Sequence, residues 1–501
     1  PLWLLSGSTL PGMARTLHWS VVLHLMLAAL STYALARRWR MSAGAAALAG
    51  LLYAGSGYLG VQTEHLNQLQ GLAWLPLVLL PDDRRGWPAP LSVGAMAMIL
   101  LAGHTQTAFI AAIAATLWRL GMGLRRGEGL WRWSYVAYSL RALLPFGLAG
   151  GIALAQLLPT LELARFSARG GGLPWREAVS FSVAPWHLPR ALLPPYIVAP
   201  LLPEGVAYLG LAGMALAGWG AWQVIRGKGQ GARDWMLLLV AALGGFLALG
   251  GFNPLYLAAV RLGVPGLVHF RAPARFLVLY VLAASLLAGR GLMALGNIRR
   301  RAWLWCGIAA ALMLAELLFA AELMPLADVT APRAYTDLRP ATAHLLAATR
   351  AAEAESAAPA GRYLSMSQVL FDPGDLTEIR QIYGAALTRE WGAWGDASED
   401  GDDGNEDARD ALWAYVVAAK QREVLAPNLS LAYQIPAVDG YDGGVLPLRH
   451  YSAFSRLLLS ASAELASEGT WDGRLRENLT AVPEGRWLSL LGVRFLLTDK
   501  T

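Results

Sequence analysis

Long apolar runs separated by short loops constrain this chain more than any other feature. A helix needs about 20 apolar residues to cross a bilayer. Only 15% of the residues are charged, against roughly 25% in soluble proteins. We therefore expect an α-helical polytopic membrane domain over residues 1–325, with about ten spans. The predicted spans are 17–36, 43–63, 69–81, 90–103, 105–121, 138–158, 205–225, 234–252, 272–294 and 302–325.

The loops between these runs predict an orientation. One alternating set of loops holds 16 Lys and Arg residues, and the opposite set holds 8. Because cytoplasmic loops carry the excess of basic residues, we expect the first set in the cytoplasm. Residues 1–16, the long loop 159–204 and everything after residue 325 are then expected on the outer face. Aromatic and apolar side chains make the loop 159–204 a candidate interfacial segment that could hold a lipid-linked substrate.

Residues 326–501 have the composition of a water-soluble domain. They contain 16 Lys and Arg against 25 Asp and Glu, whereas residues 1–325 contain 25 against 10. We expect an extracytoplasmic α/β domain. Its predicted elements are helices over 341–357 and 407–421, a strand over 361–366, and a short helix at 487–491 before a strand over 493–498.

The two ends of the chain indicate a fragment. The chain begins at Pro1 rather than Met, in a polar segment without a signal peptide. It stops just after a predicted strand that has no evident partner. We therefore expect that residues are missing at both ends.

A polar segment interrupts the apolar runs at residues 62–70, Gln62-Thr63-Glu64-His65-Leu66-Asn67-Gln68-Leu69-Gln70. Ionisable and amide groups so close to hydrocarbon are costly unless they meet water, a substrate or one another. The predicted orientation places this segment on the outer side, together with residues 103–106 and 253–275. We expect these distant segments to converge in one water-accessible hollow.

Several motifs, in order along essentially the whole chain, resemble the bacterial membrane protein YfhO family. They are Tyr53-Ala54-Gly55-Ser56-Gly57-Tyr58, His65-Leu66-Asn67, Ala73-Trp74-Leu75-Pro76, Ala102-Gly103-His104-Thr105-Gln106, Gln156-Leu157-Leu158-Pro159-Thr160-Leu161-Glu162, Phe270-Arg271-Ala272-Pro273-Ala274-Arg275-Phe276, Val438-Asp439-Gly440-Tyr441-Asp442 and Leu491-Gly492-Val493-Arg494-Phe495-Leu496-Leu497-Thr498.

That family is similar to the GT-C class of glycosyltransferases, many-spanning inverting enzymes. The resemblance implies transfer of a sugar from a polyprenyl phosphate to an envelope glycan or polymer, on the outer face of a bacterial inner membrane. In the GT-C class the key acidic residue usually lies in the first outer loop. Pro1-Leu2-Trp3 looks like the tail of that loop, so this residue is expected to precede Pro1. Family members also usually continue beyond the last strand.

Such a transfer needs a carboxylate to take the acceptor's proton, cationic or metal groups to neutralise the leaving phosphate, and an apolar groove for the prenyl chain. The candidate catalytic residues are Glu64, His65 and Glu162. The candidate substrate-binding residues are Asn67, Gln68, His104, Gln106, Arg165, Arg271, Arg275, Asp439 and Tyr441.

Each candidate also has a purely structural interpretation. Glu64 and His65 could form a hydrogen-bonded cap between two spans, and His104 and Gln106 a polar turn. Glu162 and Arg165 are spaced for a local ion pair. Arg271 and Arg275 could extend to the membrane interface without binding phosphate. Asp439 and Tyr441 could be ordinary turn residues.

The sequence leaves the metal requirement open, and a divalent cation such as Mg²⁺ or Mn²⁺ is compatible with these carboxylates. The single cysteine, Cys306, gives no Cys-based metal site. No nucleotide-binding fingerprint is present, and the basic pI does not indicate nucleic acid. Two alternatives to the transferase remain. A lipid-sugar or polysaccharide transporter predicts internal repeats, which we do not find, and a non-catalytic envelope-assembly protein predicts no substrate contacts.

Overall fold

The computed structural model describes residues 10–80, 89–124, 133–167, 170–198, 203–229, 231–296, 302–323, 338–355, 361–367, 417–440, 448–459 and 475–498. The chain divides into two compact units. The helical unit comprises residues 15–162 and 171–326, and the C-terminal unit comprises residues 1–14, 163–170 and 327–501. Each unit is described by itself.

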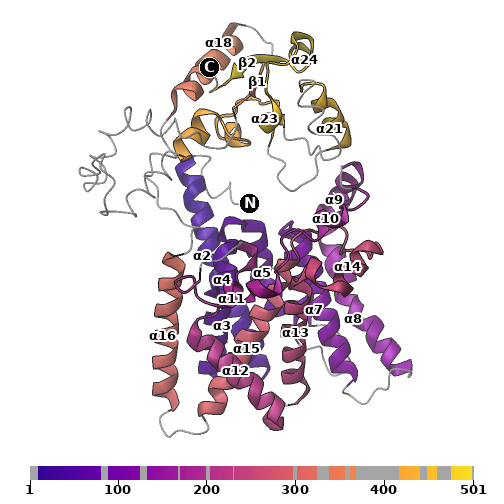
Figure 1. The fold of residues 1–501 in the computed structure, drawn as a ribbon, viewed down its shortest axis with the longest axis vertical. Helices are drawn as coiled ribbons and strands as arrows, with labels where there is room; N and C mark the ends of the chain where they lie inside the picture. Colours follow the sequence, from indigo (N-terminus) through magenta and orange to yellow (C-terminus); the bar gives the residue numbers. More distant parts are fainter. Residues whose placement is uncertain are drawn as a thin grey trace, which may run out of the picture. The chain divides into compact units, whose positions relative to one another are not determined.

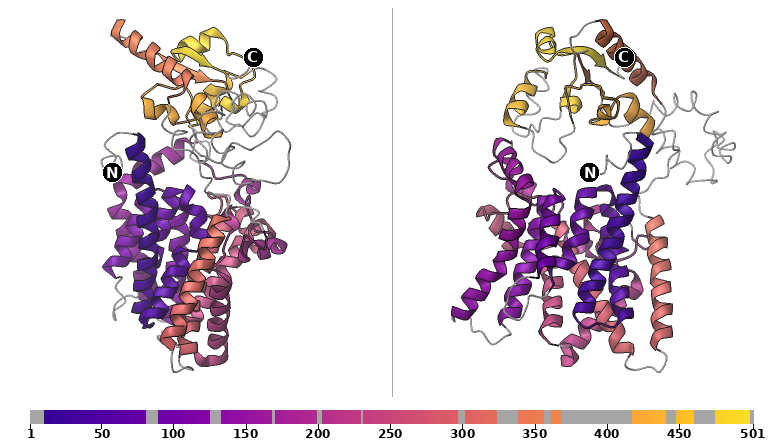
Figure 2. Two further views of the ribbon diagram at one scale, coloured as in Figure 1. Left: turned by 90° about the vertical axis from the view of Figure 1, so that its left-hand side faces the viewer. Right: turned by 180° about the vertical axis from the view of Figure 1, so that it is seen from behind.

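The long helices of the helical unit run roughly alongside one another, and short helices connect them (Figures 1 and 2). In chain order the elements are α2 (Leu10–Arg38), α3 (Ala43–Ala54), α4 (Gly57–Val61), η1 (Gln62–Glu64), α5 (Leu66–Val78), α6 (Pro90–Leu101), α7 (Thr105–Leu124), α8 (Trp133–Ile152), α9 (Leu154–Phe166), α10 (Trp175–Ala178), η2 (Pro185–His187), α11 (Leu188–Leu192), η3 (Pro203–Gly205), α12 (Leu211–Gln223), η4 (Val224–Lys228), α13 (Ala232–Ala248), η5 (Gly250–Phe252), α14 (Pro254–Arg261), η6 (Pro273–Phe276), α15 (Leu277–Gly296) and α16 (Ala302–Glu322).

Helices form at all ten predicted positions, but the prediction of ten spans is wrong. Within the described residues, three helical stretches are long and apolar enough to cross a membrane, namely 15–38, 43–64 and 273–295. Several of the other helices are too short. The 13 residues of α5 rise about 20 Å, against a hydrocarbon core of about 30 Å. The structure therefore supports a membrane-associated helical protein with a few candidate spans.

The predicted span 138–158 is broken. Residues 143–152 and 154–166 are two helical segments bent by 90° from one another, which could count as a fourth span. Gly150 and Gly151 come just before the bend, and Pro159 follows it. Sharp kinks are typical at glycine and proline, because glycine stabilises a helix poorly and proline removes one backbone hydrogen bond. Apolar composition alone did not reveal this break.

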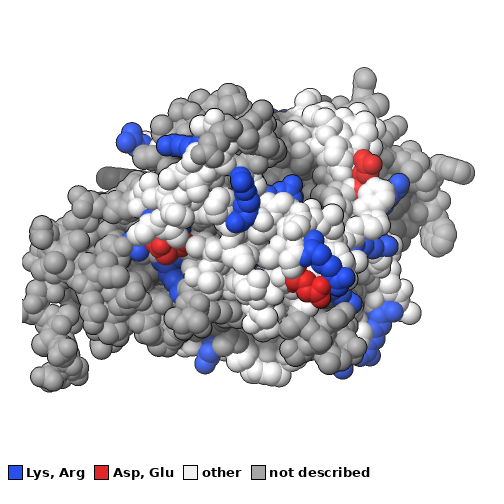
Figure 3. Space-filling model, turned by 90° about the horizontal axis from the view of Figure 1, so that it is seen from above, with Lys and Arg blue, Asp and Glu red and all other residues white. Residues whose placement is uncertain are grey.

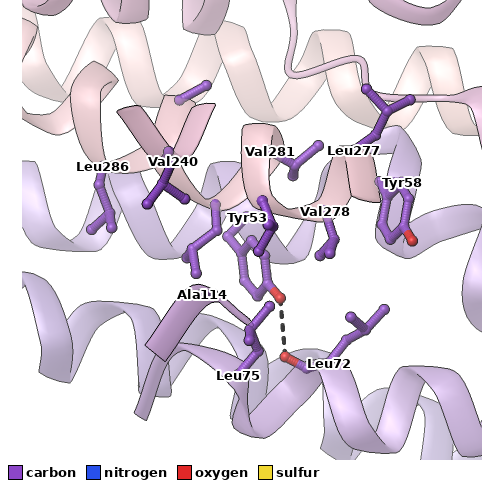
Figure 4. Packing of buried hydrophobic residues seen from close by; sticks show 14 of the residues in the cluster. Tyr53, Tyr58, Leu72, Leu75, Ala114, Val240, Leu277, Val278, Val281 and Leu286 are labelled. Carbon is purple, nitrogen blue, oxygen red and sulfur yellow. Dashed lines mark hydrogen bonds between the residues drawn. The ribbon is translucent and has the colours of Figure 1, made fainter. Parts of the chain in front are cut away.

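Helix α15 lies at the centre of the helical unit, where it packs against α3, α12 and α13. Glycines allow α12 and α15 to approach closely: a Cβ atom at Gly220 would lie 2.1 Å from the carbonyl oxygen of Leu287. Such small residues let backbones pack tightly in membranes. Figure 4 shows the adjoining core, in which the Tyr53 hydroxyl donates to the carbonyl oxygen of Leu72 at 3.0 Å.

The C-terminal unit contains a small sheet flanked by helices. Its elements are α18 (Pro340–Glu355), β1 (Arg362–Ser365), η8 (Leu429–Tyr433), α21 (Arg449–Arg456), α23 (Leu475–Asn478), α24 (Gly485–Leu490) and β2 (Val493–Leu497). The two strands pair in parallel, with Tyr363 opposite Phe495. The predicted helix 341–357, both predicted strands and the short helix before the last strand are confirmed. The final strand pairs with β1, although the sequence offered no evident partner. Most of the predicted helix 407–421 lies outside the described residues.

Candidate functional site

Arg275 brings together segments that are far apart in the sequence. It lies in η6, and its side chain is only 11% exposed. Its Nη1 donates to Oε1 of Gln106 at 2.7 Å and approaches Nε2 of His104 at 3.4 Å. Its Nη2 forms an ion pair with Oε1 of Glu204 at 3.5 Å. The guanidinium group therefore joins the start of α7 and the short helix η3 to the start of α15.

Side chains from two other helices hold the backbone around Arg275. The Nε2 atom of Gln106 donates to the carbonyl oxygens of Arg271 at 2.7 Å and of Ala272 at 3.3 Å. The Tyr58 hydroxyl donates to the carbonyl oxygen of Arg275 at 2.9 Å. Ala272 has a φ of 59°, in the left-handed region that is unfavourable for residues with a Cβ atom. These hydrogen bonds fix a turn that sequence propensity alone would not favour.

His104 is neutral in this environment. Burial, followed by the nearby Arg275 cation and His65, lowers the pKa of His104 to about 3. Its Nδ1 lies 2.7 Å from Oγ1 of Thr107. The backbone N–H of Thr107 also donates to Nδ1 at 3.2 Å, so Thr107 holds the Nδ1 side of the ring and Nε2 faces Arg275. The neutral imidazole thus lies beside the guanidinium group without adding a second positive charge.

Three side chains, from η1, its C-terminal cap and η6, have buried polar atoms that no described residue satisfies. They are both amide atoms of Gln62, Nδ1 of His65 and Nε of Arg275. Gln62 is only 1% exposed, and it follows Tyr58 by four residues, on the same face of a helical segment. The backbone N–H of His65 donates to the carbonyl oxygen of Gln62 at 3.0 Å. Buried polar groups are nearly always hydrogen-bonded, so these atoms are suited to a polar ligand.

We call Gln62, His65, His104, Gln106 and Arg275 the Arg275 cluster. It contains donors from Arg275 and both a donor and an acceptor from Gln62. A charged guanidinium matches the oxygens of a phosphate group. Glu204 already neutralises part of the positive charge, so the cluster is suited to one anionic group at a time.

The remaining predicted residues of the polar segment differ in their exposure. Glu64 and Asn67 are exposed, whereas Gln68 is buried. The guanidinium carbon of Arg271 lies 5.8 Å from the ring centre of Phe181, a cation–π arrangement. Glu64, which directly precedes His65, presents an exposed carboxylate. Of the predicted site residues, His104, Gln106 and Arg275 are joined by side-chain contacts, and Arg271 joins them through its backbone carbonyl.

Other predicted site residues are not part of the cluster. Glu162 is exposed on α9, and it forms no hydrogen bond or ion pair with the described residues of the cluster. Arg165 belongs to the C-terminal unit, where its carbonyl oxygen accepts from Nη2 of Arg449 at 3.3 Å. The predicted local ion pair between Glu162 and Arg165 does not appear among the described contacts. Tyr441 lies outside the described residues.

Asp439 is buried in the C-terminal unit, where it forms an ion pair with Arg476. Its Oδ2 accepts from Nε of Arg476 at 2.7 Å and its Oδ1 from Nη2 at 3.2 Å, with both side chains 4% exposed. Arg476 also donates to the carbonyl oxygens of Val424 and Leu425. This arrangement joins parts of the unit's interior, and it differs from the exposed acceptor surface that the sequence suggested.

Sequence reasoning missed Tyr58 and Glu204 and did not single out Gln62. Tyr58 is one of the aromatic residues in an apolar run, and nothing in its spacing distinguishes a hydrogen-bonding role from core packing. Glu204 lies at the end of the loop 159–204, in a Pro-Glu-Gly turn. Its charge in a mostly apolar stretch was the one available signal. Gln62 was visible only as part of the polar segment.

Basic side chains are spread over the described part of the face shown in Figure 3 rather than gathered in one patch. Among the described residues, no group of three or more His, Cys, Asp or Glu side chains is placed to hold a metal ion. No protein-family model matches the chain, and no curated protein matches it significantly.

Proposed function

We propose that this protein is a membrane glycosyltransferase that moves a sugar from a polyprenyl-phosphate donor to an envelope glycan or polymer. The observation that carries the proposal is the Arg275 cluster, with unsatisfied buried polar atoms on Arg275, Gln62 and His65. The cluster lies in a unit with helices apolar enough to cross a membrane. A lipid-linked phosphate is the ligand that suits both features.

The proposed chemistry divides the work between Arg275 and Glu64. The acceptor hydroxyl attacks the anomeric carbon of the sugar, and the bond from that carbon to the phosphate oxygen breaks. The electron pair of that bond goes to the phosphate, whose charge Arg275 stabilises. Glu64, the exposed carboxylate beside His65, takes the proton of the acceptor hydroxyl. His104 and Gln106 position Arg275.

The resemblance to the YfhO family and the distribution of basic loops supply the finer part of the proposal. We place the protein in a bacterial inner membrane, with the Arg275 cluster and the C-terminal unit on the outer side. Polyprenyl-phosphate sugars are used there in the GT-C class. Glu162 is left out of the proposed chemistry, because it is exposed on α9 without a contact to the cluster among the described residues.

A transfer assay tests the proposal. The full chain is reconstituted in lipid vesicles with a radiolabelled polyprenyl-phosphate sugar and an envelope glycan fraction. We expect labelled glycan from the unaltered protein and a loss of at least about tenfold with Arg275→Lys, which keeps the charge but removes the planar donor fork. Arg226→Lys is the matched control, because Arg226 lies over the ring of Trp222 and away from the cluster. Equal transfer by the Arg275→Lys variant would exclude the site.

A non-catalytic role in envelope assembly is the second candidate. The ion pair between Arg275 and Glu204 favours it, because a partly neutralised arginine is also what a purely structural site requires. The two candidates differ in the transfer assay. The non-catalytic role predicts no labelled glycan from any acceptor fraction, while the phenotype of a deletion strain is rescued equally by the unaltered chain and by the Glu64→Gln variant.

A further inference from the structure

An exposed aromatic and apolar surface lies on short helices that precede and follow α13, namely α10, η2, η5 and α14. We call it the α14 surface and define it by Trp175, Trp186, Phe252, Leu255 and Leu262. In Figures 1 and 2, α14 lies at the side of the helical unit and does not run along its length. Leu262 is 83% exposed, Leu255 71% and Trp186 67%. Neighbouring apolar side chains that are this strongly exposed are typical of an interaction surface.

The two faces of α14 are both apolar. Tyr256 and Val260, four residues apart, are buried, and the Tyr256 ring packs edge-on against that of Phe276. Leu255 and Leu262 are seven residues apart, so they share the opposite, exposed face. An ordinary surface helix has polar residues on that face. The exposed face of α14 is therefore suited to a second apolar medium.

The contacts of α14 hold this face in a fixed direction. Asn253 caps the helix, because its Oδ1 accepts from the backbone N–H groups of Leu255 at 3.0 Å and of Tyr256 at 3.3 Å. Its Nδ2 donates to the carbonyl oxygen of Phe246 in α13 at 2.8 Å. The rings of Trp186 and Phe252 pack edge-on, with centres 5.2 Å apart. The surface is thus continuous with the apolar helices of the unit.

Two exposed arginines border this surface. The guanidinium carbons of Arg176 and Arg261 lie 5.5 Å and 4.8 Å from the ring centre of Trp175. Glu177, the acidic residue of α10, is partly buried. Tryptophan and arginine together are typical of the zone where lipid headgroups meet the acyl chains. The two cations complement the phosphates of lipids and do not require an acidic protein partner.

We propose that the α14 surface is an interfacial anchor that lies in the headgroup layer of the bilayer and binds anionic phospholipids. Leu255 and Leu262 enter the outermost part of the acyl chains, and Arg176 and Arg261 contact lipid phosphates. This anchor does not depend on the proposed transferase activity. It would fix the depth at which the helical unit sits, whatever reaction the protein carries out.

A spin-label measurement tests the anchor. In the full chain, Cys306→Ala removes the single cysteine, and Leu262→Cys or Leu255→Cys supplies a labelling site on an exposed position. The labelled protein is placed in phosphatidylcholine vesicles, with and without phosphatidylglycerol. Accessibility to oxygen, which concentrates in lipid, is compared with accessibility to a water-soluble nickel complex. Leu30→Cys, an exposed position of α2, is the lipid-facing reference. Val482→Cys, an exposed position of the C-terminal unit, is the water-facing reference.

We expect both α14 labels to favour oxygen over nickel, at a depth between those of the two references. Phosphatidylglycerol should shift them deeper, and the double variant Arg176→Gln, Arg261→Gln should remove that shift. Labels at Leu255 and Leu262 that match the Val482 reference would overturn the anchor. A lipid-facing result without any effect of phosphatidylglycerol would overturn the binding of anionic lipids. A label shielded from both reagents would also overturn the anchor, because a second copy of the chain would then cover the surface.

Discussion

Arg275 donates from Nη1 to the side-chain oxygen of Gln106 at 2.7 Å, across 169 residues of sequence. The same glutamine donates to the carbonyl oxygens of Arg271 and Ala272. Gln106 therefore holds both the guanidinium group and the backbone turn that presents it. No property of residues 105–107 by themselves would reveal this double role, since it arises only when α7 packs beside the start of α15.

Replacing Gln106 by leucine should destabilise the helical unit. The Gln106→Leu variant leaves the carbonyl oxygen of Arg271 without its side-chain donor and Nη1 of Arg275 without its acceptor at 2.7 Å, at a cost of about 1–3 kcal/mol. Thermal unfolding followed by tryptophan fluorescence in detergent measures the loss. Gln70→Leu is the matched control, because Gln70 makes one long hydrogen bond of 3.5 Å to Ser20. Equal losses in the two variants would argue against the role assigned to Gln106.

Acidification should destabilise the protein through His104. The pKa of His104 is about 3 in the folded protein, against about 6.5 in an unfolded chain. Between these values the unfolded chain binds a proton that the folded protein does not. The contribution of neutral His104 to the free energy of unfolding is therefore complete above pH 6.5. It is lost as the pH falls toward 3, at about 1.4 kcal/mol per tenfold rise in proton concentration.

The His104→Gln variant should flatten the dependence of unfolding temperature on pH over that window. His344→Gln, on α18 of the C-terminal unit, is the control for a general effect of removing a histidine. A steep acid dependence that survives in His104→Gln but disappears in His344→Gln would contradict this assignment.

Glu316 should be a structural residue of the helical unit. Its Oε1 accepts from the hydroxyls of Tyr196 and Tyr208 and from the backbone N–H of Leu211 at the start of α12. All three partners donate to the same carboxylate oxygen. Burial, followed by the hydrogen bond with Glu316, raises the pKa of Tyr208.

Glu316→Ala should lower the thermal unfolding temperature by an amount that corresponds to roughly 2–3 kcal/mol, because three donors lose their acceptor. Glu316→Gln, whose amide oxygen still accepts, should lose less. Glu322→Ala is the control, since Glu322 is exposed on the same helix. The assignment fails if the Glu316 and Glu322 variants unfold at the same temperature.

The ion pair between Asp439 and Arg476 should be essential to the C-terminal unit. Asp439→Asn leaves a buried arginine without its anion, which costs about 3–5 kcal/mol. Glu484→Gln breaks the pair between Glu484 and Arg486, whose side chains are 67% and 68% exposed, and should change stability by less than about 1 kcal/mol. Limited proteolysis of the full chain compares the two. Similar protease resistance in both variants would show that the buried pair contributes little.

The sequence predicted the helices well but their lengths poorly. Apolar composition correctly located helices such as α5 and α6, yet it did not show where they end. α3 ends at Gly55, and Ser56 caps α4, so one apolar run became several segments. The bend between α8 and α9 has the same origin, because glycine and proline act on backbone geometry without changing mean hydropathy.

The candidate site was predictable where charge stood out against hydrocarbon. His104, Arg271 and Arg275 are costly in an apolar setting, and they are joined by the described contacts. Tyr58 could not be found in this way, because its role depends on a hydroxyl that reaches a backbone carbonyl 217 residues away. Asp439 was misinterpreted for a related reason. A turn-like sequence does not disclose that Arg476 fills the space beside it.

The binding of polyprenyl phosphate tests the central claim most directly, because it requires neither the sugar nor the acceptor. The full chain in lipid nanodiscs is titrated with polyprenyl phosphate, and the dissociation constant is compared for the unaltered protein, Arg275→Lys and the Arg226→Lys control. We predict binding that Arg275→Lys weakens by roughly tenfold or more and that Arg226→Lys leaves unchanged. Equal affinity in all three proteins, or no binding to any of them, would contradict the assignment of the Arg275 cluster as a phosphate site.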